Sequence, residues 1–291
     1  MIDGRSTLPD VPQDFPHDPT LFAAPFFVLA LLLEIPLLRR MRERGRDVLG
    51  YPERKDTWAN LAMGLGSLPF VTAINVTVFV LAQKVWPHRL VDLGDGPLGW
   101  TVALIGWDFA YYWHHRAEHE VRLFWANHVN HHSSQSFNLS TALRQPWTPV
   151  LGIVLYPPLA LVGVRPWMII VSGGINLIYQ FWVHTEAVSK LPRALELVLN
   201  TPSHHRVHHG KNPQYLDKNY GGILIVWDRL FRSFEEERER VVYGLTKDID
   251  TFNPLRIAFH EYASLARDVA QARSVRGALS LIFRGPGYVP R

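Results

Sequence analysis

The histidines of this chain gather in clusters whose spacing suits metal binding. The sequence contains 14 histidines, and eleven of them lie in the middle of the chain. His115 and His119 are four positions apart, so in a helix their imidazoles share one face. Two further clusters, His128–His132 and His205–His209, repeat one pattern, H-x-x-H-H. Because neutral imidazole binds iron, zinc, copper and nickel, three such clusters predict a metal site.

The H-x-x-H-H pattern also predicts more than one ion. In a helix the first and last histidines of the pattern point to one side, while the middle one points about 100° away and can meet a second ion. Eight clustered histidines are too many for one tetrahedral zinc and enough for two ions. His184, at the end of an apolar run, is a ninth candidate. Gln180 precedes it by four residues and is placed to orient a ligand or a bound water.

Several other polar residues lie close to these clusters. His114 and His204 adjoin candidate ligands, and we expect them to support those ligands. Four carboxylates either orient imidazole N–H groups or serve as capping and surface residues, and the sequence leaves both roles open: Asp108, Glu118, Asp217 and Asp228. The isolated histidines are not expected to bind metal: His17, His88 and His260.

The chain has no cysteine, which excludes disulfides, thiolate metal sites and iron–sulfur clusters. A metal site must therefore use histidine and carboxylate ligands. The sequence also has no flavin fingerprint and no haem-attachment motif. A redox reaction at this site would need electrons from an external donor.

Long apolar runs must position the clusters. They cover residues 21–38, 58–86, 98–113, 150–164 and 167–183. About 20 apolar residues cross a bilayer as a helix, and ten Trp and ten Tyr suit membrane interfaces. A soluble protein can also bury apolar helices, but a series of runs with Arg- and Trp-marked ends favours a membrane. We predict an all-α, multi-pass membrane protein with about four to five apolar helices and a cytoplasmic helical cap that carries the histidine clusters.

The charges between the runs predict the orientation. The net charge is +4 and the sequence pI is about 9.4. The densest basic stretch, Arg39–Arg46, directly follows the first run, which favours a membrane anchor over nucleic-acid binding. Cytoplasmic loops are rich in Lys and Arg, so this loop and all the histidine clusters are predicted on the cytoplasmic face. The lack of cysteine and the Arg- and Pro-rich composition favour a bacterial inner membrane.

The chain is predicted to have three parts: an N-terminal arm (1–20), a membrane-embedded domain (21–235) and a C-terminal helical extension (236–291). Residues 165–166 are predicted as a tight turn between the last two runs. Ile223–Phe234 is predicted at the membrane interface, Glu235–Arg240 as a solvated charge run, and Pro254–Arg273 as an amphipathic helix.

Three motifs resemble those of the fatty acid hydroxylase/sterol desaturase superfamily. They are Asp108–His119 (DFAYYWHHRAEH), His128–His132 (HVNHH) and Asn200–Gly210 (NTPSHHRVHHG). The continuation through Asp217–Gly222 and Trp227–Phe231 is similar to the alkylglycerol monooxygenase branch and its bacterial relatives. The resemblance covers roughly residues 55–235. At position 180 the chain has Gln where some members of the family have His.

This resemblance implies a membrane-bound non-haem di-iron oxygenase that uses O2 to hydroxylate an aliphatic C–H bond of a lipid, of fatty acyl, alkyl or sterol type. No catalytic residue is expected beyond the metal centre. Electrons would come from a ferredoxin, a cytochrome-type protein or, as in animal members of the branch, a pterin. The implied iron ligands are His115, His119, His128, His131, His132, His184, His205, His208 and His209.

Other reactions remain open at this point. Hydroxylation and desaturation begin with the same hydrogen abstraction, and no residue decides between them; the branch resemblance favours hydroxylation. A membrane zinc hydrolase would need H-E-x-x-H, and His119-Glu120 lacks the second histidine. A metal carrier predicts polar residues inside the spans, whereas here they cluster at span ends. Five aromatic residues are either a lipid slot or ordinary lipid-facing rings: Phe109, Tyr112, Trp113, Phe181 and Trp182.

Overall fold

The computed structural model describes residues 16–289, and it confirms the predicted all-α class. The longer helices are α1 (Pro19–Glu43), α2 (Arg54–Val85), α3 (Pro97–Glu120), α4 (Arg122–His132), α7 (Pro166–Val183) and α11 (Pro254–Ala270). The shorter ones are α5 (Gly152–Leu155), α6 (Leu159–Val162), α8 (Arg193–Val198), α9 (Pro202–His208), α10 (Val226–Leu230) and α12 (Val275–Phe283), with 3-10 turns η1 (Trp86–His88) and η2 (Leu139–Leu143). In this part of the chain, β structure is limited to two isolated bridges.

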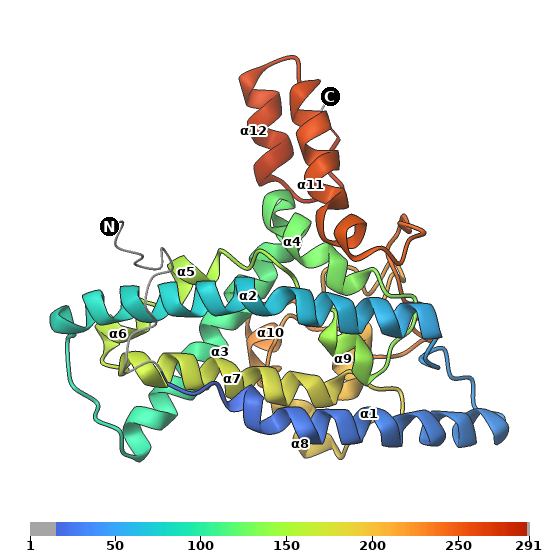
Figure 1. Ribbon diagram of the computed structural model, residues 1–291, viewed down its shortest axis with the longest axis horizontal. Coiled ribbons are helices and arrows are strands. Elements are labelled where there is room, and N and C mark those ends of the chain that lie inside the picture. Colours follow the sequence, from blue (N-terminus) through green and yellow to red (C-terminus); the bar gives the residue numbers. More distant parts are fainter. Residues whose placement is uncertain (1–15, 290–291) are drawn as a thin grey trace, which may run out of the picture.

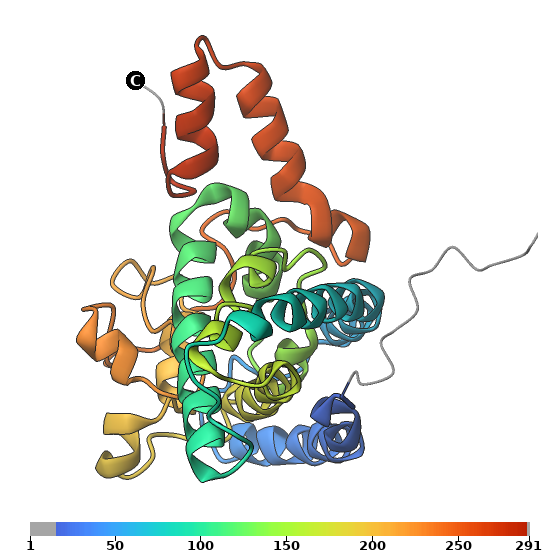
Figure 2. The same ribbon diagram turned by 90° about the vertical axis from the view of Figure 1, so that its left-hand side faces the viewer.

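Three helices are long and apolar enough to cross a membrane: α1, α2 and α7. They run side by side in Figure 1 and are seen nearly end-on in Figure 2. Only 11% of the most apolar window of α1 is buried, and 22% of that of α2. Helices that turn so much apolar surface outward need an apolar surrounding, which indicates a membrane protein.

Two of the five apolar runs form something other than the simple spans expected from sequence. Residues 98–113 belong to α3, which stands upright in Figure 2 across the three long helices and continues into the histidine cluster. Residues 150–164 were expected as one arm of a hairpin with 167–183; Tyr156, Ala160 and Val164 do pack against α7, but the arm is not one continuous helix. It forms two four-residue helices, α5 and α6, because Pro157 and Pro158 cannot continue a helix and Gly163 ends α6 at φ 107°.

The interior is divided into an apolar and a polar half. The apolar half joins α2, α3 and α7, where Trp107 stacks on Tyr156 with ring centroids 4.5 Å apart. The polar half lies between α3, α4, α7 and α9. Buried polar groups there fix the connecting loops: Glu34, from the middle of α1, accepts hydrogen bonds from the Leu139 backbone N–H and the Thr185 hydroxyl. The apolar half thus anchors helices whose other ends carry the histidines.

The C-terminal segment forms a helical hairpin, α11 and α12, that projects from the body in Figure 1. Its first helix matches the predicted amphipathic segment, and ion pairs from Arg122 to Glu261 and Asp268 attach it to α4. The stretch Ile223–Phe234 contains only the five-residue helix α10. Most of the predicted N-terminal arm, residues 1–15, lies outside the described residues.

Candidate metal centre

Nine buried histidines form two adjoining groups. Group I comprises His115, His119, His128, His132 and His208; group II comprises His131, His184, His205 and His209. Within each group one nitrogen of every ring lies within 4.8 Å of the corresponding nitrogen of every other ring. The groups touch, since the ring centroids of His132 and His209 are 4.5 Å apart. All nine sequence candidates are therefore brought together.

The H-x-x-H-H pattern divides between the groups as helical geometry predicts. In α4 the outer pair, His128 and His132, belongs to group I, while the middle residue His131 belongs to group II. At α9 the division is reversed: the outer pair belongs to group II and His208 to group I. Each helix thus contributes to both groups, which holds the two groups at a fixed separation.

In four of the five rings of group I the outer nitrogen lies near an oxygen atom. His115 Nδ1 donates to the Tyr220 carbonyl over 2.8 Å, and His208 Nδ1 to the Lys218 carbonyl over 2.9 Å. His128 Nδ1 lies 3.3 Å from a Glu118 carboxylate oxygen, and His119 Nδ1 lies 3.4 Å from Asp217. Oxygen acceptors at Nδ1 fix the tautomer and leave the Nε2 lone pair pointing inward.

Group II is oriented mainly by backbone carbonyls. His131 Nδ1 donates to the Arg144 carbonyl over 3.2 Å, and His184 Nδ1 to the Gln180 carbonyl over 2.6 Å. The Arg144 side chain is fully buried, and it donates to the Asn130 carbonyl and the Asp56 carboxylate. The Arg144 guanidinium thus fixes the end of α4, and the Arg144 backbone carbonyl fixes His131.

The inward nitrogens of both groups need a cation between them. Because His131 and His184 each donate Nδ1–H to a carbonyl, both Nε2 atoms carry lone pairs, yet these atoms lie 3.1 Å apart. In group I the buried Nε2 atoms of His119 and His208 have no hydrogen-bond partner. Facing lone pairs repel and unpartnered buried nitrogens are costly, and a bound metal ion relieves both.

The nitrogen separations also fit metal coordination. The Nε2 atoms of His115 and His128 are 2.9 Å apart, and those of His184 and His205 are 2.9 Å apart. Adjacent ligands at right angles on an ion with bonds of about 2.1 Å are about 3.0 Å apart, and tetrahedral ligands about 3.4 Å. Five nitrogens in group I likewise exceed a tetrahedral set. Both groups therefore offer enough closely spaced nitrogens to hold a metal ion, and group I offers more than a tetrahedral zinc site uses.

Burial keeps most of these rings neutral. It lowers the pKa values well below 6.5, with a further contribution from neighbouring imidazoles, for His128, His132, His184, His205, His208 and His209. Burial likewise lowers the pKa of His131 to about 4. Neutral imidazole is the form that binds metal, so both groups are ready to bind at neutral pH.

Comparison with known proteins agrees with this geometry. A profile of the fatty acid hydroxylase family matches residues 100–233, a range that contains all nine histidines. This part of the chain belongs to the fatty acid hydroxylase family. The resemblance inferred from the three histidine motifs is thereby confirmed.

The relatives of this fatty acid hydroxylase domain fall into two sets. Alkylglycerol monooxygenase of Homo sapiens is 43% identical over 274 residues, which cover 92% of this chain and 59% of the relative. The Danio rerio protein of the same name is 41% identical with the same coverage. Lathosterol oxidase of Mus musculus is 27% identical over 181 residues, 58% of each chain. The chain thus spans 59% of the length of the first relatives, and no solved structure matches it.

A buried carboxylate positions the loop that supplies the carbonyls of group I in the hydroxylase domain. Asp108 accepts hydrogen bonds from the backbone N–H groups of Ile223 and Leu224 and from Trp227 Nε1. A Cβ at Gly222 would lie 2.8 Å from Asp108 Oδ1, so glycine permits this close approach. Asp228 accepts from the backbone N–H of Tyr220, and burial raises its pKa to about 6. Asp108 and Asp228 therefore bind backbone and do not contact the imidazoles.

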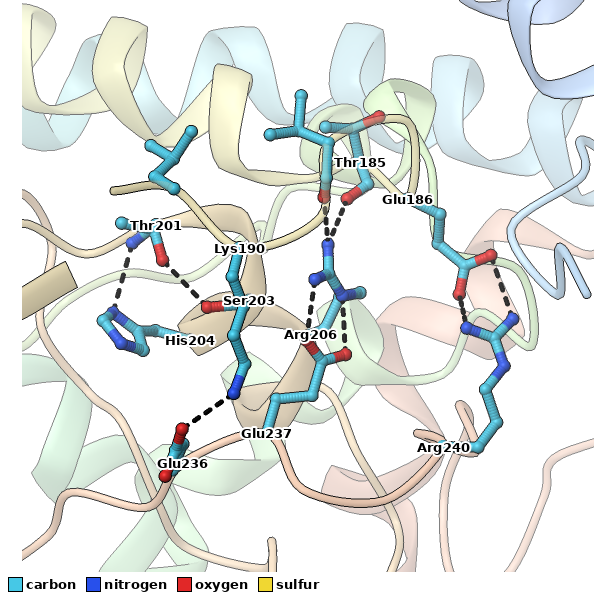
Figure 3. A network of polar contacts seen from close by, with 12 residues as sticks. Thr185, Glu186, Lys190, Thr201, Ser203, His204, Arg206, Glu236, Glu237 and Arg240 are labelled. Carbon is cyan, nitrogen blue, oxygen red and sulfur yellow. Dashed lines mark hydrogen bonds and ion pairs between the residues drawn. The ribbon is translucent and has the colours of Figure 1, made fainter. Parts of the chain in front are cut away.

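A second polar network braces group II (Figure 3). Arg206, which lies between His205 and His208 in α9, donates to both Glu237 oxygens and to the carbonyls of Thr185 and Val188. Arg240 pairs with the buried Glu186, two residues after His184. The stretch Glu235–Arg240 was expected to be a solvated charge run. Glu237 and Arg240 instead lock the segment after His184 onto α9, because these two charges find buried partners of opposite sign.

The remaining sequence candidates lie outside the two groups. His114 Nδ1 pairs with the Tyr156 hydroxyl, while His204 lies 3.0 Å from Glu196 and caps α9. Gln180 holds His184 by its backbone, and its side-chain amide binds Tyr111 and Asn176. The isolated histidines His17, His88 and His260 are not members of either group. The aromatic candidates split, since Phe109, Tyr112 and Trp113 pack around Phe231 whereas Phe181 and Trp182 pack around Phe27.

Sequence reasoning missed the backbone acceptors. The carbonyls of Lys218, Tyr220 and Arg144 orient three of the nine rings, and no side-chain pattern reveals a carbonyl. Arg144 did offer a signal, because it is the one charged residue in the otherwise uncharged stretch 139–152. A lone charge in such a stretch indicates a buried ion pair.

Proposed function

We propose that this chain is a membrane-bound non-haem di-iron oxygenase that hydroxylates an aliphatic C–H bond of a lipid with O2. The proposal is carried by two adjoining groups, of five and four histidines, whose Nε2 lone pairs face one another. The relatives support it, since their names describe monooxygenation of alkylglycerols and oxidation of lathosterol. The lipid is of fatty acyl, alkyl or sterol type.

The nine histidines are the proposed ligands, with one iron ion in each group. Bound iron would supply the reaction with O2 that breaks an unreactive C–H bond, which no side chain can do. The protein's own part is to keep the imidazoles neutral, to fix their Nε2 atoms inward through Nδ1 hydrogen bonds, and to exclude water by burial. Apolar helices beside the site would bring the lipid chain to it without crossing water.

The proposal includes an orientation and an external electron donor. Arg39–Arg46 covers the last turn of α1 and the residues after it, at the end of the molecule that carries the histidines, so this end is proposed to be cytoplasmic. A ferredoxin, a cytochrome-type protein or a pterin would deliver electrons there. Composition alone supports placement in a bacterial inner membrane.

We further propose that residues 21–235 form the catalytic domain and residues 236–291 an extension. The family profile ends at residue 233, and the α11–α12 hairpin projects beyond the body (Figure 1). The extension nevertheless contacts α4, so its removal is expected to destabilise the metal centre.

Metal analysis of the purified protein, combined with lipid analysis of cells, tests the function. Two irons per chain are expected, together with a lipid class that gains one oxygen atom only when the gene is present. The matched variant His131→Ala should abolish the product. A loss of two hydrogens would identify a desaturase with the same centre, and one tightly bound zinc with no oxidised lipid would overturn the proposal.

A further inference from the structure

We propose that the α11–α12 hairpin lies flat on the membrane at the histidine-bearing face and binds anionic lipid headgroups. The proposal rests on the proposed placement of α2 and α7 in a bilayer. It depends on neither the metal nor the reaction, so a test of bilayer contact can fail while the proposed function stands.

The hairpin is attached to α2 at the depth of a headgroup layer. Ile257 and Ala258 of α11 pack against Ala59 and Met63 of α2. Met63 is 22 positions before Val85, where α2 ends. At 1.5 Å per residue this is about 33 Å, between the hydrocarbon thickness of about 30 Å and the full bilayer thickness of about 40–45 Å. The hairpin therefore starts where α2 would leave the hydrocarbon.

The far end of α2 marks the opposite interface. Trp86 follows α2, and Arg89 lies over its ring. Nearby, Trp100 of α3 and Trp167 of α7 meet edge to face with ring centroids 5.5 Å apart. Tryptophans gathered at helix ends are typical of a membrane interface. The two interfaces thus bracket one bilayer thickness along α2.

The direction of the hairpin agrees with a surface position. In Figure 1 the three long helices lie horizontally and α11 and α12 stand upright. Figure 2, turned by 90°, shows the long helices strongly foreshortened and the hairpin still upright. Helices at right angles to membrane spans lie parallel to the bilayer plane. In Figure 1, α12 is on the side of α11 nearer to the Val85 end of α2, which is the side that faces the bilayer.

The hairpin has the chemistry of an interfacial helix. On α12, Val275, Leu279 and Phe283 recur every four residues, so they form one apolar stripe, and they are 78%, 49% and 58% exposed. Leu255 and Phe259 continue exposed apolar surface on α11. An apolar face with flanking Arg residues is typical of helices that lie in the headgroup region.

The charge of the hairpin selects the lipid. Five arginines are exposed, and within the described part of the chain none of them forms an ion pair: Arg256, Arg267, Arg273, Arg276 and Arg284. The two carboxylates of the segment, Glu261 and Asp268, are both paired with Arg122 of α4. Both carboxylates are therefore paired within the protein, and the unpaired charges on the surface of the hairpin are positive. Anionic headgroups are the complementary partner at this depth.

The absence of cysteine allows a direct test on the whole protein in lipid nanodiscs. A nitroxide at Leu279→Cys reports whether α12 touches lipid, through its collision rates with O2 and with a water-soluble nickel chelate. Leu68→Cys, on the exposed side of α2 five positions nearer to Val85 than Met63, gives the lipid reference, and Arg238→Cys, in the polar loop, gives the aqueous reference. In phosphatidylglycerol nanodiscs we expect the Leu279 ratio of O2 to nickel collisions to exceed the Arg238 ratio several-fold.

A charge variant separates headgroup binding from apolar contact. In protein carrying Arg273→Gln, Arg276→Gln and Arg284→Gln, the Leu279 label should move toward the aqueous reference, as it should in phosphatidylcholine nanodiscs. Arg238→Gln in an otherwise unchanged chain carrying Leu279→Cys is the control and should leave the label where it was. A Leu279 label that matches the aqueous reference in both lipids overturns the proposal. Protection of the label only after an acidic ferredoxin is added would assign the face to a protein partner and overturn it too.

Discussion

The two histidine groups differ in both ligand number and electrostatic surroundings. Group I has five rings, and two carboxylates, Glu118 and Asp217, lie near its outer nitrogens. Group II has four rings, and carbonyls orient two of them. Burial is the main cause of the lowered pKa of His131 in group II, and beyond burial the Glu118 carboxylate raises this pKa while the Arg144 guanidinium lowers it by a smaller amount.

This difference suggests a division of labour in the proposed centre. An ion in group I would have more protein ligands and nearby anions, which stabilise positive charge. An ion in group II would have one ligand fewer, so it should be held less tightly and have more room for an external ligand. Group II is therefore the expected site of O2 or substrate approach.

The largest expected effect comes from removing one histidine from each group in turn, which tests whether group II holds its metal less tightly than group I. His184→Ala leaves group II with three rings, whereas His132→Ala leaves group I with four. We expect His184→Ala to lose one metal per chain and more than about 100-fold of lipid oxidation, since a direct ligand exceeds the 10–100-fold effect of its supporting partners. His132→Ala should retain more metal. Metal content per chain and product formation are the measurements.

His260→Ala serves as the matched control, because His260 lies outside both groups on α11. Its metal content should equal that of the unaltered protein. If His132→Ala loses as much metal as His184→Ala, the two groups are equivalent and the proposed division fails. Circular dichroism of each variant separates metal loss from unfolding.

Neutralising the buried carboxylate tests the electrostatic part of the comparison. In Glu118→Gln the amide oxygen can still accept from Asn127, but the negative charge 3.3 Å from His128 Nδ1 is removed and an NH2 group faces that nitrogen. We expect the metal affinity of group I to fall about 10- to 100-fold, and that of group II to fall less, through the smaller effect of Glu118 on His131. Competition with a coloured chelator measures both ions.

Glu120→Gln is the matched control on the same helix. Glu120 is partly exposed and pairs with Arg116, so Glu120→Gln should leave the metal affinity of both groups nearly unchanged. Equal weakening of both ions by Glu118→Gln would show that the carboxylate supports the helix and not one group.

Sequence alone predicted the ligand candidates and their division better than it predicted the path of the chain. The division follows from helical periodicity within α4 and around α9, which a local pattern contains in full. The apolar run 150–164 breaks into α5 and α6 at Pro157 and Pro158, and apolar character alone, which predicted one helix, does not reveal this break. The carbonyls of Tyr220 and Arg144 reach the rings only through tertiary contacts made by Asp108 and Asp56. No local pattern contains such information.

The smallest expected effect comes from the exposed carboxylate. Asp217 has φ 58°, a left-handed conformation that Asn also adopts readily, so Asp217→Asn removes charge while keeping the backbone. Its side chain is 60% exposed and lies 3.4 Å from His119 Nδ1, so water and salt screen the interaction. We expect the affinity of group I to fall by less than about tenfold, below the effect of Glu118→Gln, and the fall to shrink further in high salt. The same chelator competition measures it. An effect as large as that of Glu118→Gln would mean that burial does not set the strength of these two supports, and the contrast between the groups would then rest on ligand number alone.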